Sequence, residues 1–180
     1  MSMRDLAWPL LAVALAGCQA TESPHRFGLG RPVTEAEIAA WNIDASPGNG
    51  GLPPGRGDVA TGRALFDATC VACHGEKGEG IPPFPRLVGG QGTLATAKPV
   101  LTIGSFWPYA VTVFDYVRRA MPFPDPQSLG NDEVYALTAY LLYLNGILPE
   151  TAELDAPRLL AVRMPNRDGF IADDRPDEGR

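Results

Sequence analysis

Two cysteines and a histidine stand close together in this chain and could hold a redox cofactor. Cys70 and Cys73 are three residues apart, and His74 follows directly. This CxxCH spacing is the attachment signature of c-type haem, in which both thiols bond to one porphyrin. Both sulfurs project from one short turn, and the imidazole of His74 can reach the iron from the proximal side. The motif predicts one covalent haem c, with Cys70 and Cys73 as its links and His74 as an axial iron ligand.

Two other chemistries use similar residues. A structural zinc site needs a second pair of ligands, and a thioredoxin-like redox pair normally opens a helix after a strand. The only other cysteine in the sequence is Cys18, and the only other histidine is His25. The sequence therefore favours covalent haem over an incomplete metal site.

A haem that carries electrons needs a second axial ligand that stays bound in both oxidation states. A methionine thioether meets this need and favours ferrous iron. We expect Met121 to be this ligand, because the prolines at 122, 124 and 126 stiffen the loop that follows it. Met164, which also precedes a proline, and His25 are alternatives, as is an open iron site.

Several residues near Met121 have more than one interpretation. Arg118 and Arg119 either pair with a haem propionate or complement the negative end of a helix. The aromatic residues at 106, 107 and 109 are expected to pack around the haem rather than to bind a substrate.

The surrounding pattern predicts a mainly helical fold. Apolar residues recur at helical spacing over 58–69, directly before the motif, and over 111–120. A third helix is expected over 131–144, with Asn131 as its N-cap and an apolar composition typical of a buried helix. It should cross the first helix at Gly62, where the missing side chain permits close approach. Segment 75–92 is rich in glycine and proline and is expected to be an irregular loop.

The N-terminal part has a different character. Thr34 and Glu37 form an N-terminal capping pattern for a short helix over 34–41. Eight of the twelve residues from 46 to 57 are glycine or proline, which predicts a linker.

The first residues resemble an export signal. The apolar stretch from Leu6 to Ala16 is too short to span a bilayer, and residues 15–18 read Leu-Ala-Gly-Cys, like a bacterial lipobox. Cys18 would then carry a lipid anchor, and cleavage after Ala20 is the alternative. We expect a periplasmic protein, attached to a membrane through Cys18 or otherwise soluble.

Length and charge limit the remaining possibilities. A chain of 180 residues with 45% hydrophobic residues can bury one core. We assign residues 1–17 to the signal, 18–57 to an N-terminal arm with its linker, 58–150 to the haem domain and 151–180 to a C-terminal arm with an acidic tail. The formal charge of −6 argues against nucleic acid as a partner and favours a basic docking surface.

Further segments make the pattern more specific than the haem motif alone. They read FGLGRPVT (27–34), AWNID (40–44), GLPPG (51–55), GSFWPY (104–109), VFDYVRRAMPF (113–123) and MPNRDGF (164–170). Together they resemble the SoxD family, the cytochrome c subunit of Sox-type sulfur dehydrogenase. The resemblance implies a class I cytochrome c fold, with helices packed around one haem and extended arms at both ends. It also implies a SoxC-like molybdenum-cofactor partner that oxidises sulfane sulfur or sulfite.

These observations lead to one functional prediction and two alternatives. We expect an electron-transfer subunit that accepts electrons from the molybdenum protein and passes them to a downstream acceptor, without being catalytic alone. Two-haem members of the family contain a second cytochrome domain, whereas this sequence has one CxxCH motif. The main alternative is a freestanding electron carrier that serves a terminal oxidase. A haem enzyme or gas sensor would require an open iron site.

Overall fold

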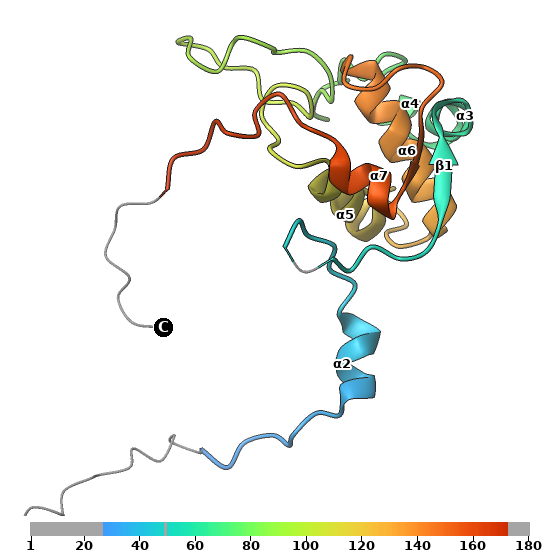
Figure 1. Ribbon diagram of the computed structural model, residues 1–180, viewed down its shortest axis with the longest axis vertical. Coiled ribbons are helices and arrows are strands. Elements are labelled where there is room, and N and C mark those ends of the chain that lie inside the picture. The colour runs from blue at the N-terminus through green and yellow to red at the C-terminus, as the bar shows by residue number, and fades with distance from the viewer. Residues whose placement is uncertain (1–26, 49, 173–180) are drawn as a thin grey trace, which may run out of the picture. The chain divides into compact units, whose positions relative to one another are not determined.

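The computed structural model describes residues 27–48 and 50–172, and its regular elements are mainly helical (Figure 1). The elements are α2 (Glu35–Trp41), β1 (Arg56–Asp58), α3 (Val59–Thr69), α4 (Val71–His74), α5 (Ala110–Ala120), α6 (Asn131–Leu144), β2 (Glu153–Asp155) and α7 (Ala156–Ala161). The expected signal segment, Cys18, His25 and the end of the acidic tail lie outside the described residues. Among the described helices, none is long and apolar enough to cross a membrane.

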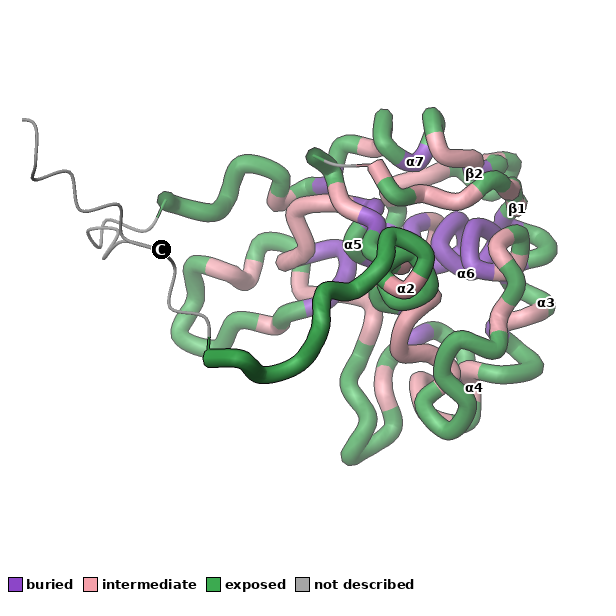
Figure 2. The backbone as a smooth tube through the Cα atoms, turned by 90° about the horizontal axis from the view of Figure 1, so that it is seen from below, coloured by how far each residue is buried: buried purple, intermediate pink, exposed green. Residues whose placement is uncertain are grey.

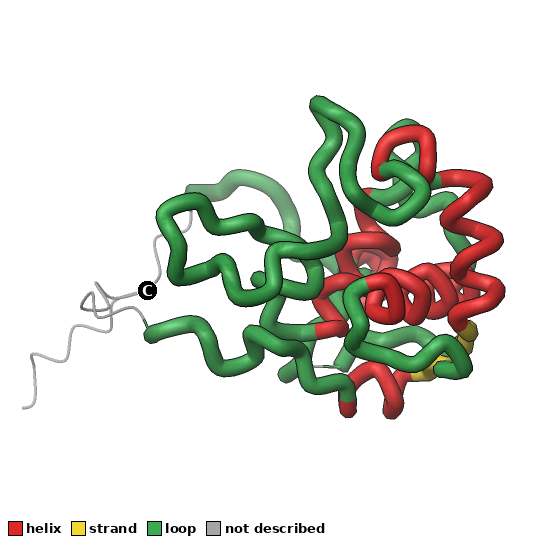
Figure 3. Tube along the Cα trace, turned by 90° about the horizontal axis from the view of Figure 1, so that it is seen from above, coloured by secondary structure: helices red, strands yellow, loops and turns green. Residues whose placement is uncertain are grey.

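Helix α6 is the centre of the fold, as its apolar composition predicted. Every residue from Val134 to Leu142 is buried, and Figure 2 shows α6 enclosed by α3, α5 and the strand pair. A helix that is apolar on all sides has to be covered on all sides. Helices α3 and α5 and both strands are therefore arranged around α6, while long loops extend from one side of the helices (Figure 3).

Helix α3 crosses α6 at Gly62, as the sequence predicted. Gly62 is buried, and a Cβ atom at this position would overlap the carbonyl group of Ala136. The two backbones therefore approach more closely than any residue with a side chain would allow. Four residues later on α3, Phe66 packs edge-to-face on Tyr140, with 5.3 Å between the ring centroids.

Polar groups at the helix starts fix where α3 and α6 begin. The carboxylate of Asp58 accepts a hydrogen bond from the Thr61 N–H at 2.7 Å, which lowers the pKa of Asp58. In α6 the carboxylate of Glu133 accepts from the Gly130 N–H at 2.7 Å. Asn131 is the first residue of α6 rather than its N-cap, which is Gly130. Its side chain instead donates to the carbonyl of Pro54 at 3.2 Å.

A short antiparallel strand pair joins the two ends of the haem domain, and the sequence did not predict it. Gly57 of β1 lies opposite Leu154 of β2. The chain then continues into α7, where Asp155 accepts from the Arg158 N–H at 2.9 Å. Leu154, Leu159 and Met164 are all buried in the core. Residues 153–164, assigned above to the C-terminal arm, thus pack as part of the domain.

The chain up to Ile38 forms a separate unit. The capping pattern predicted for it is present: the Thr34 hydroxyl accepts from the Glu37 N–H at 3.3 Å, and the Glu37 carboxylate accepts from the Thr34 N–H at 2.9 Å. The hydrogen-bonded Arg31 guanidinium and the Thr34 contacts lower the pKa of Glu37 to about 2. Helix α2 has no buried residue.

Candidate functional site

Cys70, Cys73 and His74 lie on one turn at the junction of α3 and α4. The Cys70 N–H closes α3 by donating to the Phe66 carbonyl at 2.8 Å. The Cys70 carbonyl in turn accepts from the N–H groups of Cys73 at 3.1 Å and of His74 at 2.9 Å. Both cysteines are half-buried. The turn predicted from the CxxCH spacing is thus formed, with two thiols available for covalent attachment.

The orientation of the His74 ring is set by one hydrogen bond. Its Nδ1 atom lies 2.9 Å from the carbonyl oxygen of Pro85. A carbonyl can only accept, so Nδ1 carries the hydrogen and Nε2 keeps its lone pair. Metal-bound histidines commonly donate their second ring nitrogen in this way, which fixes the ring and raises its basicity. His74 is therefore prepared to act as an axial ligand through Nε2.

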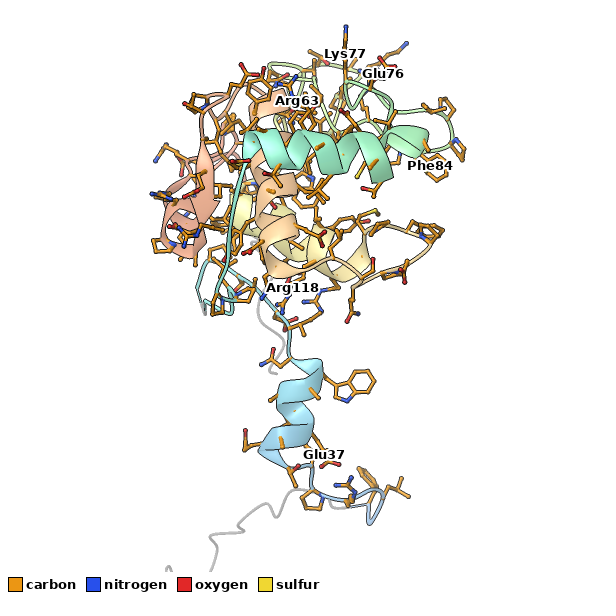
Figure 4. The ribbon with its side chains drawn as sticks, turned by 90° about the vertical axis from the view of Figure 1, so that its right-hand side faces the viewer. Glu37, Arg63, Glu76, Lys77, Phe84 and Arg118 are labelled. Carbon is orange, nitrogen blue, oxygen red and sulfur yellow. The ribbon has the colours of Figure 1, made fainter. Side chains whose placement is uncertain are left out.

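The loop after α4 brings the Pro85 carbonyl to His74. The carbonyls of Cys73 and His74 accept from the N–H groups of Ile81 at 3.1 Å and Gly80 at 2.7 Å. Gly80 has a φ of 81°, and a Cβ atom there would lie only 2.7 Å from the Arg86 nitrogen. The loop can close on α4 only because this residue is glycine. Figure 4 shows Phe84 on the outer side of the same loop.

The sulfur of Cys70 is partly shielded from water. Its burial raises the pKa of the Cys70 thiol, while the nearby Thr69 hydroxyl, 3.3 Å from the sulfur, opposes part of this rise. The group therefore remains a neutral thiol at pH 7. A thioether forms when an S–H group adds across a vinyl double bond, so this reaction uses a thiol and releases no leaving group.

The structure treats the two candidate methionine ligands differently. Met121 directly follows α5, where its N–H donates to the Val117 carbonyl at 3.1 Å. Its side chain is half-buried and packs against the core. Met164 is only 1% exposed and lies within the core itself. The Met164 side chain is thus enclosed by the core, whereas that of Met121 is partly accessible.

Several half-buried apolar side chains pack against the core and leave surface on which a porphyrin could pack. They come from several parts of the chain and include Val71, Leu87, Trp107, Tyr109 and Met121. Trp107 stacks edge-to-face on Tyr116 at 5.8 Å, and the Arg167 guanidinium lies 4.1 Å from the Tyr109 ring. With the two thiols and the oriented imidazole, this apolar set fits a covalent haem.

Arg118 and Arg119 have a function that the sequence interpretation missed. Arg118 donates to the Ile43 carbonyl at 3.0 Å, and Arg119 bonds to Asp44 at 2.6 Å and to Asp115 at 2.9 Å. Both arginines therefore hold the N-terminal arm. The four-residue spacing of Asp115 and Arg119 could have indicated their pairing, but no local signal points to Asp44.

Comparisons with known proteins agree with this arrangement. A family profile described as Cytochrome c matches residues 59–145. A chain in the crystal structure of the sulfane dehydrogenase SoxCD from Paracoccus pantotrophus is 49% identical. The match covers 83% of this chain and 74% of that chain, with a TM-score of 0.76.

Two further relatives match shorter stretches. Cytochrome c-554(547) from Halothiobacillus neapolitanus is 48% identical over 33 residues, which are 18% of this chain and 36% of that protein. Thiosulfate dehydrogenase TsdBA from Marichromatium purpuratum is 27% identical over 47% of this chain and 17% of that chain, with a TM-score of 0.37.

The close contact at Gly80 leads to a stability prediction. Gly80→Ala should lower the free energy of unfolding by about 2–3 kcal/mol, because it adds a collision with the backbone of residue 86 to the strain of a positive φ. Gly92→Ala is the matched control, since Gly92 has a φ of 76° and open space around it. The free energy of unfolding of Gly92→Ala should fall by only about 1 kcal/mol. Denaturant titration of both proteins measures the difference, and equal losses would contradict the prediction.

Proposed function

Since this chain belongs to the SoxD-type cytochromes c, we propose that it is the electron-accepting subunit of a sulfur-compound dehydrogenase. The observation that carries the proposal is the 49% identity to a chain of SoxCD over 83% of this sequence. The family binds haem c covalently, and the role of the chain is electron transfer. Its partner would be a SoxC-like molybdenum protein that oxidises sulfane sulfur or sulfite.

In this proposal Cys70 and Cys73 hold the haem, and His74 and Met121 bind its iron. Bound haem c supplies one-electron chemistry as its iron alternates between the ferric and ferrous states. The Pro85 carbonyl keeps His74 in the tautomer that coordinates through Nε2. Met121 supplies a neutral, soft sulfur that stabilises the ferrous form. The residues around the site therefore set the potential and exclude water without binding a substrate.

Two apolar surfaces support a stable protein partner over a freestanding carrier. On the N-terminal arm, Leu29 is 89% exposed, Val33 61% and Trp41 86%. Near the proposed haem site, Phe84 and Phe123 are also exposed. Exposed apolar side chains gathered on one segment are typical of an interaction surface. A freestanding carrier would not need such an arm.

The apolar side chains of the C-terminal arm differ in how far the domain covers them. Met164 is buried in the core, and Phe170 packs on Phe106 with 5.2 Å between their ring centroids. Met164 therefore belongs to the core, whereas Phe170 remains 54% exposed. We propose that the partner docks on the N-terminal arm and on the loops at 82–87 and 121–126, which flank the proposed haem site.

We further propose that the protein is exported to the periplasm and anchored through a lipid on Cys18. The support is the lipobox-like sequence at 15–18 after a short apolar stretch.

The ligand assignment predicts different effects for the two methionine variants. Met121→Ala should abolish the near-infrared band of methionine bound to ferric iron and open the iron to added ligands. Met164→Ala should keep that band but lower the free energy of unfolding by about 2–5 kcal/mol, because it leaves a cavity in the core. Absorption spectra and denaturant titration of the holoproteins measure both effects. A band that survives in Met121→Ala but disappears in Met164→Ala would reverse the assignment.

The partner proposal predicts that the chain co-purifies with a molybdenum protein from its native source. Metal analysis should find molybdenum in the complex, and a sulfane-sulfur or sulfite substrate should reduce the haem. Trp41→Ala should weaken the complex by roughly tenfold or more, since a tryptophan at an interface commonly contributes about 2 kcal/mol. The haem spectrum and the free energy of unfolding should remain unchanged.

Leu160→Ala is the control for this experiment, because Leu160 is a 49% exposed apolar residue on α7. It should leave the affinity for the partner unchanged. If Trp41→Ala loses stability while its reduction rate stays at the wild-type value, the docking role of the arm is wrong. If no molybdenum protein co-purifies and none reduces the haem, the freestanding carrier is the better description.

The anchor predicts the chemistry of the mature N-terminus. Mass spectrometry of the protein from its native membrane should find a first residue Cys18 that carries acyl chains. An unmodified N-terminus at Thr21 would instead indicate cleavage after Ala20 and a protein without this anchor.

A further inference from the structure

A cluster of polar contacts fastens the N-terminal arm to the last turns of α5. We call it the arm clamp, and it consists of Ile43, Asp44, Ala45, Asp115, Arg118 and Arg119. The Arg118 guanidinium donates to the Ile43 carbonyl at 3.0 Å, and Figure 4 shows Arg118 beside the chain that comes from α2. The Ala45 N–H donates to Asp115 at 2.9 Å. Three consecutive arm residues are thus bound to one short stretch of helix.

Arg119 and Asp115 are the centre of the clamp. Arg119 contacts both oxygens of Asp115, from Nη2 at 2.9 Å and from Nε at 3.2 Å. The same Nη2 atom also donates to Asp44 at 2.6 Å. Such a bidentate contact fixes both the orientation of the guanidinium and its distance from the Asp115 carboxylate. Asp115 therefore holds Arg119 on α5, and Arg119 holds Asp44 of the arm.

Partial burial distinguishes the Asp115–Arg119 pair of the clamp from an exposed surface ion pair. Burial alone would raise the pKa of Asp115, but bonds from Arg119 and Ala45 and the charges of both arginines lower it overall. Asp115 is only 22% exposed in its side chain, and Ala45 beside it is 5% exposed. The Asp115–Arg119 pair is therefore screened less by solvent than a fully exposed pair. The Arg119–Asp44 pair, whose side chains are 37% and 66% exposed, is screened more.

The clamp lies directly beside Met121 in the chain. Arg118 and Arg119 are in the last turn of α5, and Met121 follows that turn with its N–H still bonded to Val117. A contact that fixes the end of α5 therefore also limits where the Met121 backbone can be.

We propose that the arm clamp is a positioning device for the distal iron ligand. By fixing the last turn of α5 to the arm, the clamp would hold the Met121 sulfur on the iron. A change in the position of the arm would then change the redox potential of the haem. This inference rests on the proposed function, in which Met121 binds the iron. Because coupling between two sites is reciprocal, a partner that displaces the arm would weaken the iron–sulfur bond. Arg119, Asp115 and Asp44 are positioning residues in this scheme, since they contact neither haem nor substrate.

The test compares Arg119→Gln with Arg163→Gln in the full-length holoprotein. Arg163 pairs with Asp168 at 2.6 Å, and both are exposed, so this control removes an arginine–aspartate pair elsewhere on the surface. The probe is imidazole binding to the ferric protein, which competes with the methionine sulfur. Arg119→Gln should bind imidazole about fivefold to tenfold more tightly, as expected for the loss of about 1 kcal/mol of hydrogen-bonded ion pairing. It should also have a weaker iron–methionine band and a lower midpoint potential, whereas Arg163→Gln should match the wild type.

Two further variants keep the proposal testable if Arg119→Gln does not fold. Arg119→Lys retains the charge but cannot contact both oxygens of Asp115 in the same way, so it should bind imidazole with intermediate affinity. Asp44→Asn removes only the exposed carboxylate of the arm and should increase the affinity for imidazole about twofold to threefold. If both variants bind imidazole like the Arg163→Gln control, the proposal is overturned.

Met121→Ala in the same assays separates the two proposals. If its spectrum lacks the iron–methionine band while Arg119→Gln behaves like Arg163→Gln, the ligand assignment stands and the clamp proposal is wrong. If the band survives in Met121→Ala, the ligand assignment fails and the clamp proposal fails with it.

Discussion

The close approach of α3 and α6 at Gly62 determines where the cofactor site can form. A side chain at this position would collide with the backbone of Ala136, so the absence of a Cβ atom sets the distance between the two helices. Helix α6 is buried along most of its length and cannot move to compensate. Since α3 runs directly into Cys70, its position on α6 also fixes the turn that carries both thiols and His74.

Local signals in the sequence predicted the parts of this arrangement that depend on neighbours in the chain. The helical spacing before the motif and the apolar run of α6 each reflect contacts within a few residues. The CxxCH turn belongs to the same class, because its geometry is closed by hydrogen bonds from Cys73 and His74 to Cys70. The comparison with SoxCD confirms the cytochrome fold expected from these signals.

Contacts between distant segments could not be predicted in the same way. The strand pair joins Gly57 to Leu154, and three-residue strands are too short to produce a period-two pattern. Met164 precedes a proline much as Met121 does, and only its burial in the folded chain distinguishes the two. Likewise Arg118 and Arg119 had a plausible explanation as helix-end charges, because nothing near them in the sequence indicates that the arm returns to α5.

The two sides of the proposed iron site differ in how far apart in the sequence the residues lie whose contacts fix them. On the His74 side, the key bond to Pro85 spans 11 residues and is enclosed in one loop that is itself bonded to α4. On the Met121 side, the contacts that fix the end of α5 span 75 residues and reach into the arm. A loop closed on itself keeps its geometry when a partner binds, whereas a contact with a distant segment of the chain can be changed by whatever binds that segment. Partner binding should therefore act on the potential through Met121, while His74 remains constant.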